Sequence, residues 1–410
     1  MNYQQKIAEI VKDASVKKAL ELLKSQEQET LDVQLELCAI QSPSNQEEIR
    51  ARRFYELMKQ IGLDDVYMDE VNNVIGLRKG TGNGPTLVIA AHMDTVFSQD
   101  TDCTPRKDKD GWIWAPGICD DTRGMAEVYS IAKVFCEAGI RSAGDIYFVG
   151  DVGEESMGDL KGSRHLFDSN KNIDAFLSID GAKPENLVIH GIGGYKYRFT
   201  YTGRGGHALS AFGIPNANNA LGYAAAGIAA LEVPESPRTI FNIGVMNGGV
   251  SVNAIPTEAM MMLDIRSMGQ DTLECLNQKV LDIVKSACEK ENRRWNHPTE
   301  KIELKIELLS HRPCGTQNVS DPIVQAGIAA YKHFGITPYI TPGNSTDSNI
   351  PISRGIPALT VSRGGIQLDG HTVNERFDPT DAYVGPQKDL VLALMISGLD
   401  GICPSVLGEK

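Results

Sequence analysis

The stretch Leu87-Val-Ile-Ala-Ala-His-Met-Asp-Thr95 predicts a buried strand that ends in side chains able to bind a metal. The apolar run from Leu87 to Ala91 is too short for a helix and is typical of a strand covered on both faces. His92 and Asp94 follow directly, and the two-residue period of a strand puts them on the same side. His92 could therefore bind a metal while Asp94 orients its ring, although an isolated His-x-Asp pair is weak evidence.

Outside the middle of the chain, short apolar segments of this kind alternate with helical patterns. This alternation predicts an α/β fold, with a mixed, mostly parallel sheet covered by helices. An amphipathic helix is also expected over residues 1–23. The predicted strands are 87–91, 146–149, 175–179 and 358–361, and the predicted helices are 47–61, 124–138 and 323–334.

The middle of the chain has a different pattern, with strands of alternating hydrophobicity and two long helical stretches. Its order is β-α-β-β-α-β, which is typical of a ferredoxin-like α+β module. We therefore predict an inserted lid or dimerisation domain at 193–309, with the catalytic domain formed by 1–192 and 310–410. The strands of the insert are expected at 195–201, 240–246, 259–266 and 302–308, and its helices at 216–231 and 272–289.

Composition limits the partners and the compartment. The chain has 410 residues and a formal net charge of -13, which repels phosphate backbones and anionic lipid headgroups. No apolar stretch reaches the ~20 residues of a spanning helix, so neither nucleic acid nor a membrane is an expected partner. The first 23 residues do not resemble a secretory signal, and the 8 cysteines show no CxxC spacing. Both features favour a cytoplasmic protein with free thiols.

Four further segments place acids or a histidine after predicted strands or in turns, where α/β sheets bind ligands. Alone, each has an ordinary alternative: Asp120 and Asp121 could cap a helix, and the other acids and the histidine could be surface or core residues. Together they are harder to dismiss. The segments are Gly117-Ile-Cys-Asp-Asp-Thr-Arg-Gly124, Val149-Gly-Asp-Val-Gly-Glu-Glu155, Ser178-Ile-Asp180 and Gly370-His-Thr-Val-Asn-Glu375.

In this order, the motifs resemble those of the dinuclear zinc exopeptidases and deacylases, the family of peptidase T, glutamate carboxypeptidase, aminoacylase and succinyl-diaminopimelate desuccinylase. The resemblance covers nearly the whole chain, although Thr122-Arg123 stands where many relatives have a lysine. It implies a cis peptide bond between Asp120 and Asp121. It also implies that His92 and Asp180 hold one metal ion, that Glu155 and His371 hold the other, that Asp120 bridges both, that Asp94 supports His92 and that Glu154 is the general base.

The same resemblance assigns roles to residues outside these motifs. His207, in Gly203-Arg-Gly-Gly-His-Ala-Leu209, would stabilise the oxyanion, often across a dimer interface. Asn253 and Arg266 would hold the carboxylate of the substrate, a task that suits the guanidinium group. The alternative is a turn histidine and a surface pair between Asp264 and Arg266. The turn Gly343-Asn-Ser-Thr-Asp347 departs from the family's Gly-Gly-Thr-Asp, and there we assign only a substrate contact of Ser345.

Two neutral imidazoles and three carboxylates suit two zinc ions, with cobalt or manganese as alternatives. Two such ions would polarise an amide carbonyl and lower the pKa of bound water. Glu154 would take a proton from this water and deliver it to the leaving nitrogen. The leading prediction is a homodimeric, peptidase T-like exopeptidase for short peptides. One alternative is an N-acyl-amino-acid deacylase or carboxypeptidase, and another is a catalytically silent relative that binds peptides or amino acids.

Overall fold

The computed structural model describes residues 2–155 and 157–408 and divides into two compact units. The first unit comprises the residues up to Gly191 and those from Thr316 onward, and the second is Ile192–Gly315. The predicted end of the insert at residue 309 falls inside strand β14 (Glu303–Arg312). The strand continues beyond the apolar run that was used to predict it, because its last residues still pair with the start of the neighbouring strand.

The first unit is built on an 8-stranded mixed sheet. From one edge to the other, its strands are β1 (Asp65–Met68), β2 (Val74–Arg78), β6 (Ile146–Asp151), β3 (Leu87–His92), β7 (Ala175–Gly181), β16 (Ala358–Ser362), β8 (Asn186–Val188) and β15 (Tyr339–Ile340). The central strands β6, β3, β7 and β16 run parallel to one another, whereas β2 pairs antiparallel with both β1 and β6. The predicted α/β class is confirmed.

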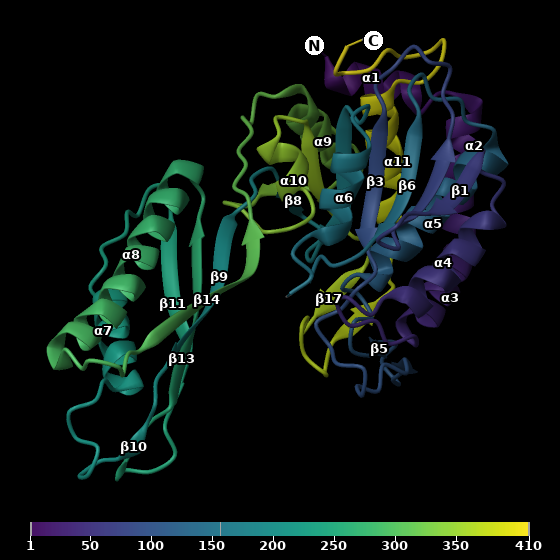
Figure 1. The fold of residues 1–410 in the computed structure, drawn as a ribbon. Helices are drawn as coiled ribbons and strands as arrows, with labels where there is room; N and C mark the ends of the chain where they lie inside the picture. Colours follow the sequence, from purple (N-terminus) through teal and green to yellow (C-terminus); the bar gives the residue numbers. More distant parts are fainter. Residues whose placement is uncertain (1, 156, 409–410) are drawn as a thin grey trace. The chain divides into compact units, whose positions relative to one another are not determined.

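Helices cover both faces of this sheet (Figure 1). Leu87 and Ile89 of β3 pack in one core cluster, while Val88 and Ala90 pack in another, which explains why the strand is apolar throughout. The first cluster includes residues of α1 (Tyr3–Ile10), α2 (Ala14–Ser25), α3 (Glu27–Cys38), α4 (Glu48–Lys59), α5 (Thr122–Ala138), α9 (Pro322–His333) and α11 (Val384–Ser397), and the second includes residues of α6 (Lys161–Ser169) and α10 (Asn349–Ser353).

The N-terminal segment differs from the prediction. Instead of one helix over 1–23, the structure has α1 and α2 with a break between them, and Met1 lies outside the described residues. The break is explained by Asp13, whose side chain accepts hydrogen bonds from the N–H groups of Ser15 and Val16. An aspartate in this role caps the start of a new helix, which is more favourable than a place inside a continuous one.

A small 4-stranded sheet supports the loop that carries His371. His371 lies between two of its strands, β17 and β18. Arg376 packs over the rings of Trp112 and Trp114, at 5.2 and 4.7 Å from their centroids. The two tryptophans therefore help to fix the end of the histidine loop. In order, the strands are β17 (Ile366–Leu368), β18 (Arg376–Asp378), β5 (Ile113–Trp114) and β4 (Arg106–Lys107).

The second unit has the predicted β-α-β-β-α-β order. Its antiparallel sheet has the order β11 (Thr239–Gly248), β13 (Glu258–Ser267), β9 (Gly193–Thr202), β14, and α7 (Ala217–Ala229) and α8 (Gln270–Trp295) pack on one face of it (Figure 1). The aromatic residues of β9 are buried and alternate with partly exposed residues, as expected for a sheet with one covered face. Two short strands, β10 (Gly206–His207) and β12 (Ala254–Ile255), form a separate pair. Within the described ranges of the chain, no helix is long and apolar enough to cross a membrane.

Candidate metal centre

The side chains that the sequence predicts as metal ligands lie where the central strands of the first unit end. His92 is the last residue of β3, Asp180 lies near the end of β7, and Glu155 follows β6. Because β6, β3 and β7 are parallel neighbours, their carboxyl ends meet at the same edge of the sheet. Asp120 reaches this edge from the turn that precedes α5.

Asp120 lies between two histidines. Its Oδ1 atom is 3.1 Å from Nε2 of His92, and its Oδ2 atom is 3.0 Å from Nε2 of His371. On the first side, Oδ1 of Asp180 lies 3.8 Å from the same nitrogen of His92. On the second side, Oε1 of Glu155 lies 2.8 Å from Nε2 of His371. The structure thus brings together two imidazole–carboxylate pairs, and one carboxylate faces both.

This donor set fits two divalent cations. One potential ligand atom from each of His92, Asp120 and Glu155 lies within 4.8 Å of the others, and the same holds for His92, Asp121 and Asp180. Imidazole nitrogens and carboxylate oxygens without a thiolate suit zinc, cobalt or manganese. A carboxylate that turns each oxygen toward a different imidazole has the arrangement that a bridging ligand needs.

The carboxylates of this centre favour protonated imidazole rings. Hydrogen bonds with Asp120 and Glu155 raise the pKa of His371 to about 11. Burial lowers the pKa of His92, but its hydrogen bonds with carboxylates, first of all that of Asp120, raise the pKa well above its ordinary value. The ring of His371 is therefore protonated at neutral pH when no cation is bound, and a cation that binds here must displace that proton.

Asp94 connects His92 to the loop after β6. Its fully buried carboxylate accepts hydrogen bonds from the backbone N–H groups of Glu154 and Glu155, both at 2.9 Å, and from Oγ of Ser44 at 2.5 Å. Nδ1 of His92 lies 3.0 Å from the backbone oxygen of Asp94 and 3.5 Å from its Oδ1. The backbone carbonyl is thus the nearer partner of the ring, while the carboxylate holds the two glutamates in position.

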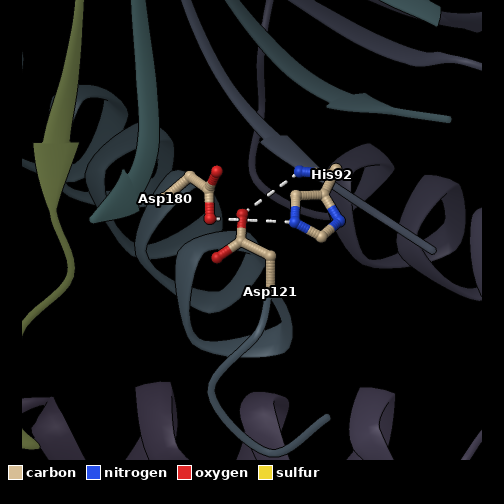
Figure 2. A group of neighbouring side chains, drawn as sticks. All are labelled: His92, Asp121 and Asp180. Carbon is tan, nitrogen blue, oxygen red and sulfur yellow. Dashed lines mark hydrogen bonds and ion pairs between the residues drawn. The ribbon is translucent and has the colours of Figure 1, made fainter. Parts of the chain in front are cut away.

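Asp121 contacts the centre through the backbone of His92. Figure 2 shows Asp121 and Asp180 turned toward this histidine. Oδ2 of Asp121 accepts a hydrogen bond of 3.2 Å from the backbone N–H of His92, and Oδ1 lies 3.1 Å from Nη1 of Arg363. Both oxygens thus have protein partners, which is typical of a supporting carboxylate. The peptide bond between Asp120 and Asp121 is cis, as the resemblance implies.

Arg363 is a buried residue of the centre that the sequence analysis missed. Its Nη1 atom lies 3.3 Å from Oδ1 of Asp120, and its Nη2 atom lies 3.4 Å from Oδ1 of Asp180. Burial lowers the pKa of Arg363, but the surrounding carboxylates, first Asp120, raise it well above its ordinary value. The guanidinium is therefore a permanent positive charge beside the predicted ligands.

Comparison with known proteins identifies the family of the chain. The model of peptidase family M20/M25/M40 matches residues 88–388. The chain belongs to this family.

Relatives of this M20-family protein match it along most of its length. The uncharacterised protein YqjE of Bacillus subtilis (strain 168) is 26% identical over 389 residues, which cover 90% of this chain and 98% of that protein. The succinyl-diaminopimelate desuccinylase of Corynebacterium glutamicum is 26% identical over 238 residues, 56% of this chain and 64% of that protein. The crystal structure of a tripeptidase from Staphylococcus aureus subsp. aureus Mu50 has a TM-score of 0.73 at 25% identity and covers 89% of this chain and 97% of its own.

The family resemblance inferred from the motifs is therefore confirmed. The protein is a hydrolase of a metallopeptidase family, with candidate metal ligands in its first unit. The identity of the metal and of the substrate does not follow from family membership, because one fold supports many related reactions.

Glu375 is a second residue beside the candidate metal centre that the sequence analysis did not assign. Its buried carboxylate accepts hydrogen bonds from the backbone N–H groups of Gly117, Cys119 and Asp120, at 2.9, 3.0 and 3.0 Å. Burial and the charge of Asp120 raise the pKa of Glu375 to about 7. The histidine loop that ends in Glu375 thus holds the turn that presents Asp120. The only signal in the sequence was its place four residues after His371.

Glu154 and Ser345 complete the predicted residues of the first unit. Glu154 belongs to the loop that Asp94 holds, and its side chain is buried. It also lies close to Asp347, whose pKa is raised well above its ordinary value by burial and by the charges of Asp151 and Glu154. Ser345 is partly exposed in the segment before α10, and its backbone N–H bonds to Oδ1 of Asn344 at 2.9 Å.

The predicted residues of the second unit lie at two ends of its sheet. His207 and Asn253 are exposed neighbours on the paired segments around β10 and β12, where the N–H of Ala208 bonds to the backbone oxygen of Asn253 at 2.9 Å. Arg266 lies near the other end of β13, opposite Gly194, and its Nε atom bonds to Oδ2 of Asp264 at 2.9 Å. Within this unit, the structure brings His207 and Asn253 together but not Arg266.

Proposed function

We propose that this protein is a two-metal hydrolase that cleaves amide bonds of short peptides, as an exopeptidase similar to peptidase T. The observation that carries the proposal is the position of Asp120, whose two oxygens face two separate imidazole–carboxylate pairs. Peptide substrates are supported by the similarity to a protein named a tripeptidase, which extends over 89% of this chain.

The proposed metal positions use five ligands, each from a different segment of the first unit. His92 and Asp180 hold one ion, Glu155 and His371 hold the other, and Asp120 bridges them. Zinc is the expected metal, with cobalt or manganese as substitutes, because all of these ligands bind through nitrogen or oxygen. When bound, the two ions supply a polarised scissile carbonyl and a water molecule of lowered pKa.

Glu154 is the proposed proton carrier. Its neighbour Glu155 faces His371, so the two adjacent carboxylates have different surroundings and can have different roles. Glu154 would accept the proton of the attacking water and donate it to the leaving nitrogen. Asp94 supports this role by binding the backbone N–H of both glutamates, which fixes the loop from which Glu154 extends.

Residues of the second unit would bind the substrate and complete the site. Asn253 and Arg266 would hold its carboxylate, Ser345 of the first unit would contact it, and His207 would donate a hydrogen bond to the developing oxyanion. His207 lies on the separate β10–β12 pair, whereas Arg266 lies near the other end of β13, and this separation supports contributions from two subunits. A homodimer through this unit is supported by β11, an edge strand with exposed apolar side chains such as Ile240, Val245 and Met246.

An N-acyl-amino-acid deacylase or carboxypeptidase is the second candidate function. It is favoured by the similarity to a protein named succinyl-diaminopimelate desuccinylase. The same residues would serve either reaction, because both cleave an amide bond next to a carboxylate.

A substrate screen tests the proposal and separates peptide hydrolysis from deacylation. Metal-free protein is loaded with Co²⁺ or Zn²⁺ and incubated with dipeptides, tripeptides, N-acetyl amino acids and N-succinyl amino acids. The proposal predicts that peptides are hydrolysed fastest and that a chelator abolishes the activity. Faster hydrolysis of acyl amino acids would favour the second candidate. Activity that survives complete metal removal would contradict the two-metal reaction.

The enzyme is also proposed to work in the cytoplasm. All eight cysteines are free thiols, which is the expected state in a reducing compartment. Titration of the denatured protein with a thiol reagent, without added reductant, should count 8 thiols. A lower count in protein purified under non-oxidising conditions would contradict this assignment.

A further inference from the structure

Arg363 contacts only one of the two proposed metal positions. Its Nη1 atom lies 3.3 Å from Oδ1 of Asp120, and its Nη2 atom lies 3.4 Å from Oδ1 of Asp180. These same two oxygens face Nε2 of His92, at 3.1 and 3.8 Å. The guanidinium therefore touches the oxygens that would bind the ion on the His92 side.

The surroundings of Arg363 hold its guanidinium in place. Nη1 donates to the backbone oxygen of Cys119 at 2.7 Å, and Nη2 donates to that of Asp180 at 3.1 Å. Its backbone N–H bonds to the oxygen of Gly181 at 3.1 Å. At the next position, Gly364, a Cβ atom would lie 1.8 Å from the backbone oxygen of Ala382, so this backbone is tightly packed. The positive charge is thus a fixed part of the site.

The other metal position has different surroundings. There, Oδ2 of Asp120 and Oε1 of Glu155 face His371, whose side chain is 54% exposed. In the part of the chain that the structure describes, no arginine or lysine forms an ion pair with Glu155. A cation on this side would meet two carboxylates without a fixed positive charge in contact with them. Of the two oxygens of Asp120, Oδ1 is therefore in contact with the guanidinium of Arg363, whereas Oδ2 has no such fixed positive charge beside it.

We propose that Arg363 is a positioning residue that makes the two metal positions unequal. It fixes Asp120 and Asp180, and its charge weakens cation binding on the His92 side. The position formed by Glu155, His371 and Oδ2 of Asp120 consequently fills first, and the position beside Arg363 fills at higher metal concentration. This inference rests on the proposed two-metal function.

Calorimetric titration of the metal-free, full-length protein with Co²⁺ alone tests the inference. Wild-type protein should show two binding events of different affinity. Arg363→Gln removes the positive charge of the guanidinium. The ratio of the two dissociation constants should then narrow by at least about tenfold, because the guanidinium no longer repels the metal ion on the His92 side. Arg363→Lys keeps a charge without the fork-shaped geometry and should retain a ratio closer to wild type. Arg354→Gln, at an arginine that pairs with Asp168 instead, should leave both constants unchanged.

Two ligand variants identify the events. Asp180→Asn should remove the weak event and keep the tight one, whereas His371→Ala should remove the tight one. Two equal events in wild type, an unchanged ratio in Arg363→Gln, or the same ratio in the Gln and Lys variants would overturn the role of Arg363. These outcomes would leave the two-metal proposal intact. If wild-type protein bound no cation at all, the proposed function itself would fail, and the inference with it.

Discussion

Oδ2 of Asp120 lies 3.0 Å from Nε2 of His371, although 251 positions separate the two residues in the chain. The contact depends on a second connection between the same segments. Glu375, at the end of the histidine loop, accepts hydrogen bonds from three backbone N–H groups in the turn that carries Asp120. The loop thus brings an imidazole to the bridging carboxylate and also fixes the backbone from which that carboxylate extends.

Replacement of Asp120 by alanine should abolish binding of both metal ions. A bridging carboxylate offsets the mutual repulsion of two cations, and each of its oxygens faces one of the two histidines. Elemental analysis of protein purified with excess zinc should find less than one equivalent. Asp180→Asn is the matched control and should lose only one ion. Retention of one or two equivalents by the Asp120 variant would contradict the bridging role.

Glu154→Gln should keep the metal content and lower kcat by roughly 10² to 10⁴, the range for loss of a positioned acid or base. Glutamine preserves the size of the buried side chain but cannot carry the proton. Glu70→Gln, at an exposed glutamate that pairs with His165, should have no effect on kcat. A metal-free Glu154 variant would show instead that Glu154, and not only Glu155, is a ligand.

Cation binding to the metal-free protein should release protons and should strengthen as pH rises. The pKa of His371 is about 11, above its ordinary value, so the ring is protonated at pH 7 and must lose this proton to bind a cation. The observed binding enthalpy should therefore vary with the ionisation enthalpy of the buffer. The same pKa shift determines how the stability of the fold depends on pH. Without metal, the ion pairs of His371 contribute their full stability below the ordinary pKa, and this is lost as pH rises through about 11. A binding enthalpy that is independent of the buffer would contradict this prediction.

Glu375→Gln should destabilise the fold and weaken metal binding together. The amide NH₂ group would face backbone N–H groups that now bond to carboxylate oxygens, and unsatisfied buried donors cost about 1 to 3 kcal/mol. The melting temperature should fall, and the affinity for Co²⁺ should fall with it, because the turn that presents Asp120 loses its support. A variant with wild-type metal affinity would show that the turn holds Asp120 without Glu375.

The sequence predicted those parts of the site that follow strands. His92 and Asp180 come directly after apolar runs and Glu155 lies in the loop that follows another, so their meeting point follows from the parallel order of the strands. Their roles as ligands stay predictions. Arg363 could not be predicted in this way, because Val-Ser-Arg-Gly-Gly reads as a strand end and a turn, where arginines are usually exposed. Only the folded chain shows that this arginine faces three carboxylates.

The boundaries of the elements were harder to predict than their order. The β-α-β-β-α-β pattern of the insert is confirmed, but β14 extends beyond the predicted strand because its polar end still forms ladder hydrogen bonds with β9. Likewise, the amphipathic pattern of the N-terminus continues through Asp13, although the helix is interrupted there. Hydrophobic patterns record burial, whereas caps and ladder ends depend on hydrogen bonds that the pattern does not contain.

His207 provides the sharpest test of a two-subunit site. Its Nδ1 atom accepts a hydrogen bond of 3.3 Å from the N–H of Leu209, so the neutral ring carries its hydrogen on Nε2 and can donate it to an oxyanion. His207→Ala should therefore lower kcat by roughly 10² to 10³ with unchanged metal content, as for a lost oxyanion donor. His297→Ala, at a partly exposed histidine that follows α8 in the second unit, is the control and should keep wild-type kcat.

Mixing Glu154→Gln protein with His207→Ala protein then shows which subunit supplies the histidine. If His207 acts on the partner's site, a mixed dimer contains one site with both wild-type residues, and activity should return after subunit exchange. For random exchange of equal amounts, half of the dimers are mixed and each has one intact site, so about a quarter of the wild-type activity per site is expected. No recovery despite exchange verified by mass spectrometry would place His207 in the site of its own subunit. Unchanged kcat in the single variant would make it an ordinary turn histidine, because a donor to the oxyanion acts in the transition state and its loss must appear in kcat.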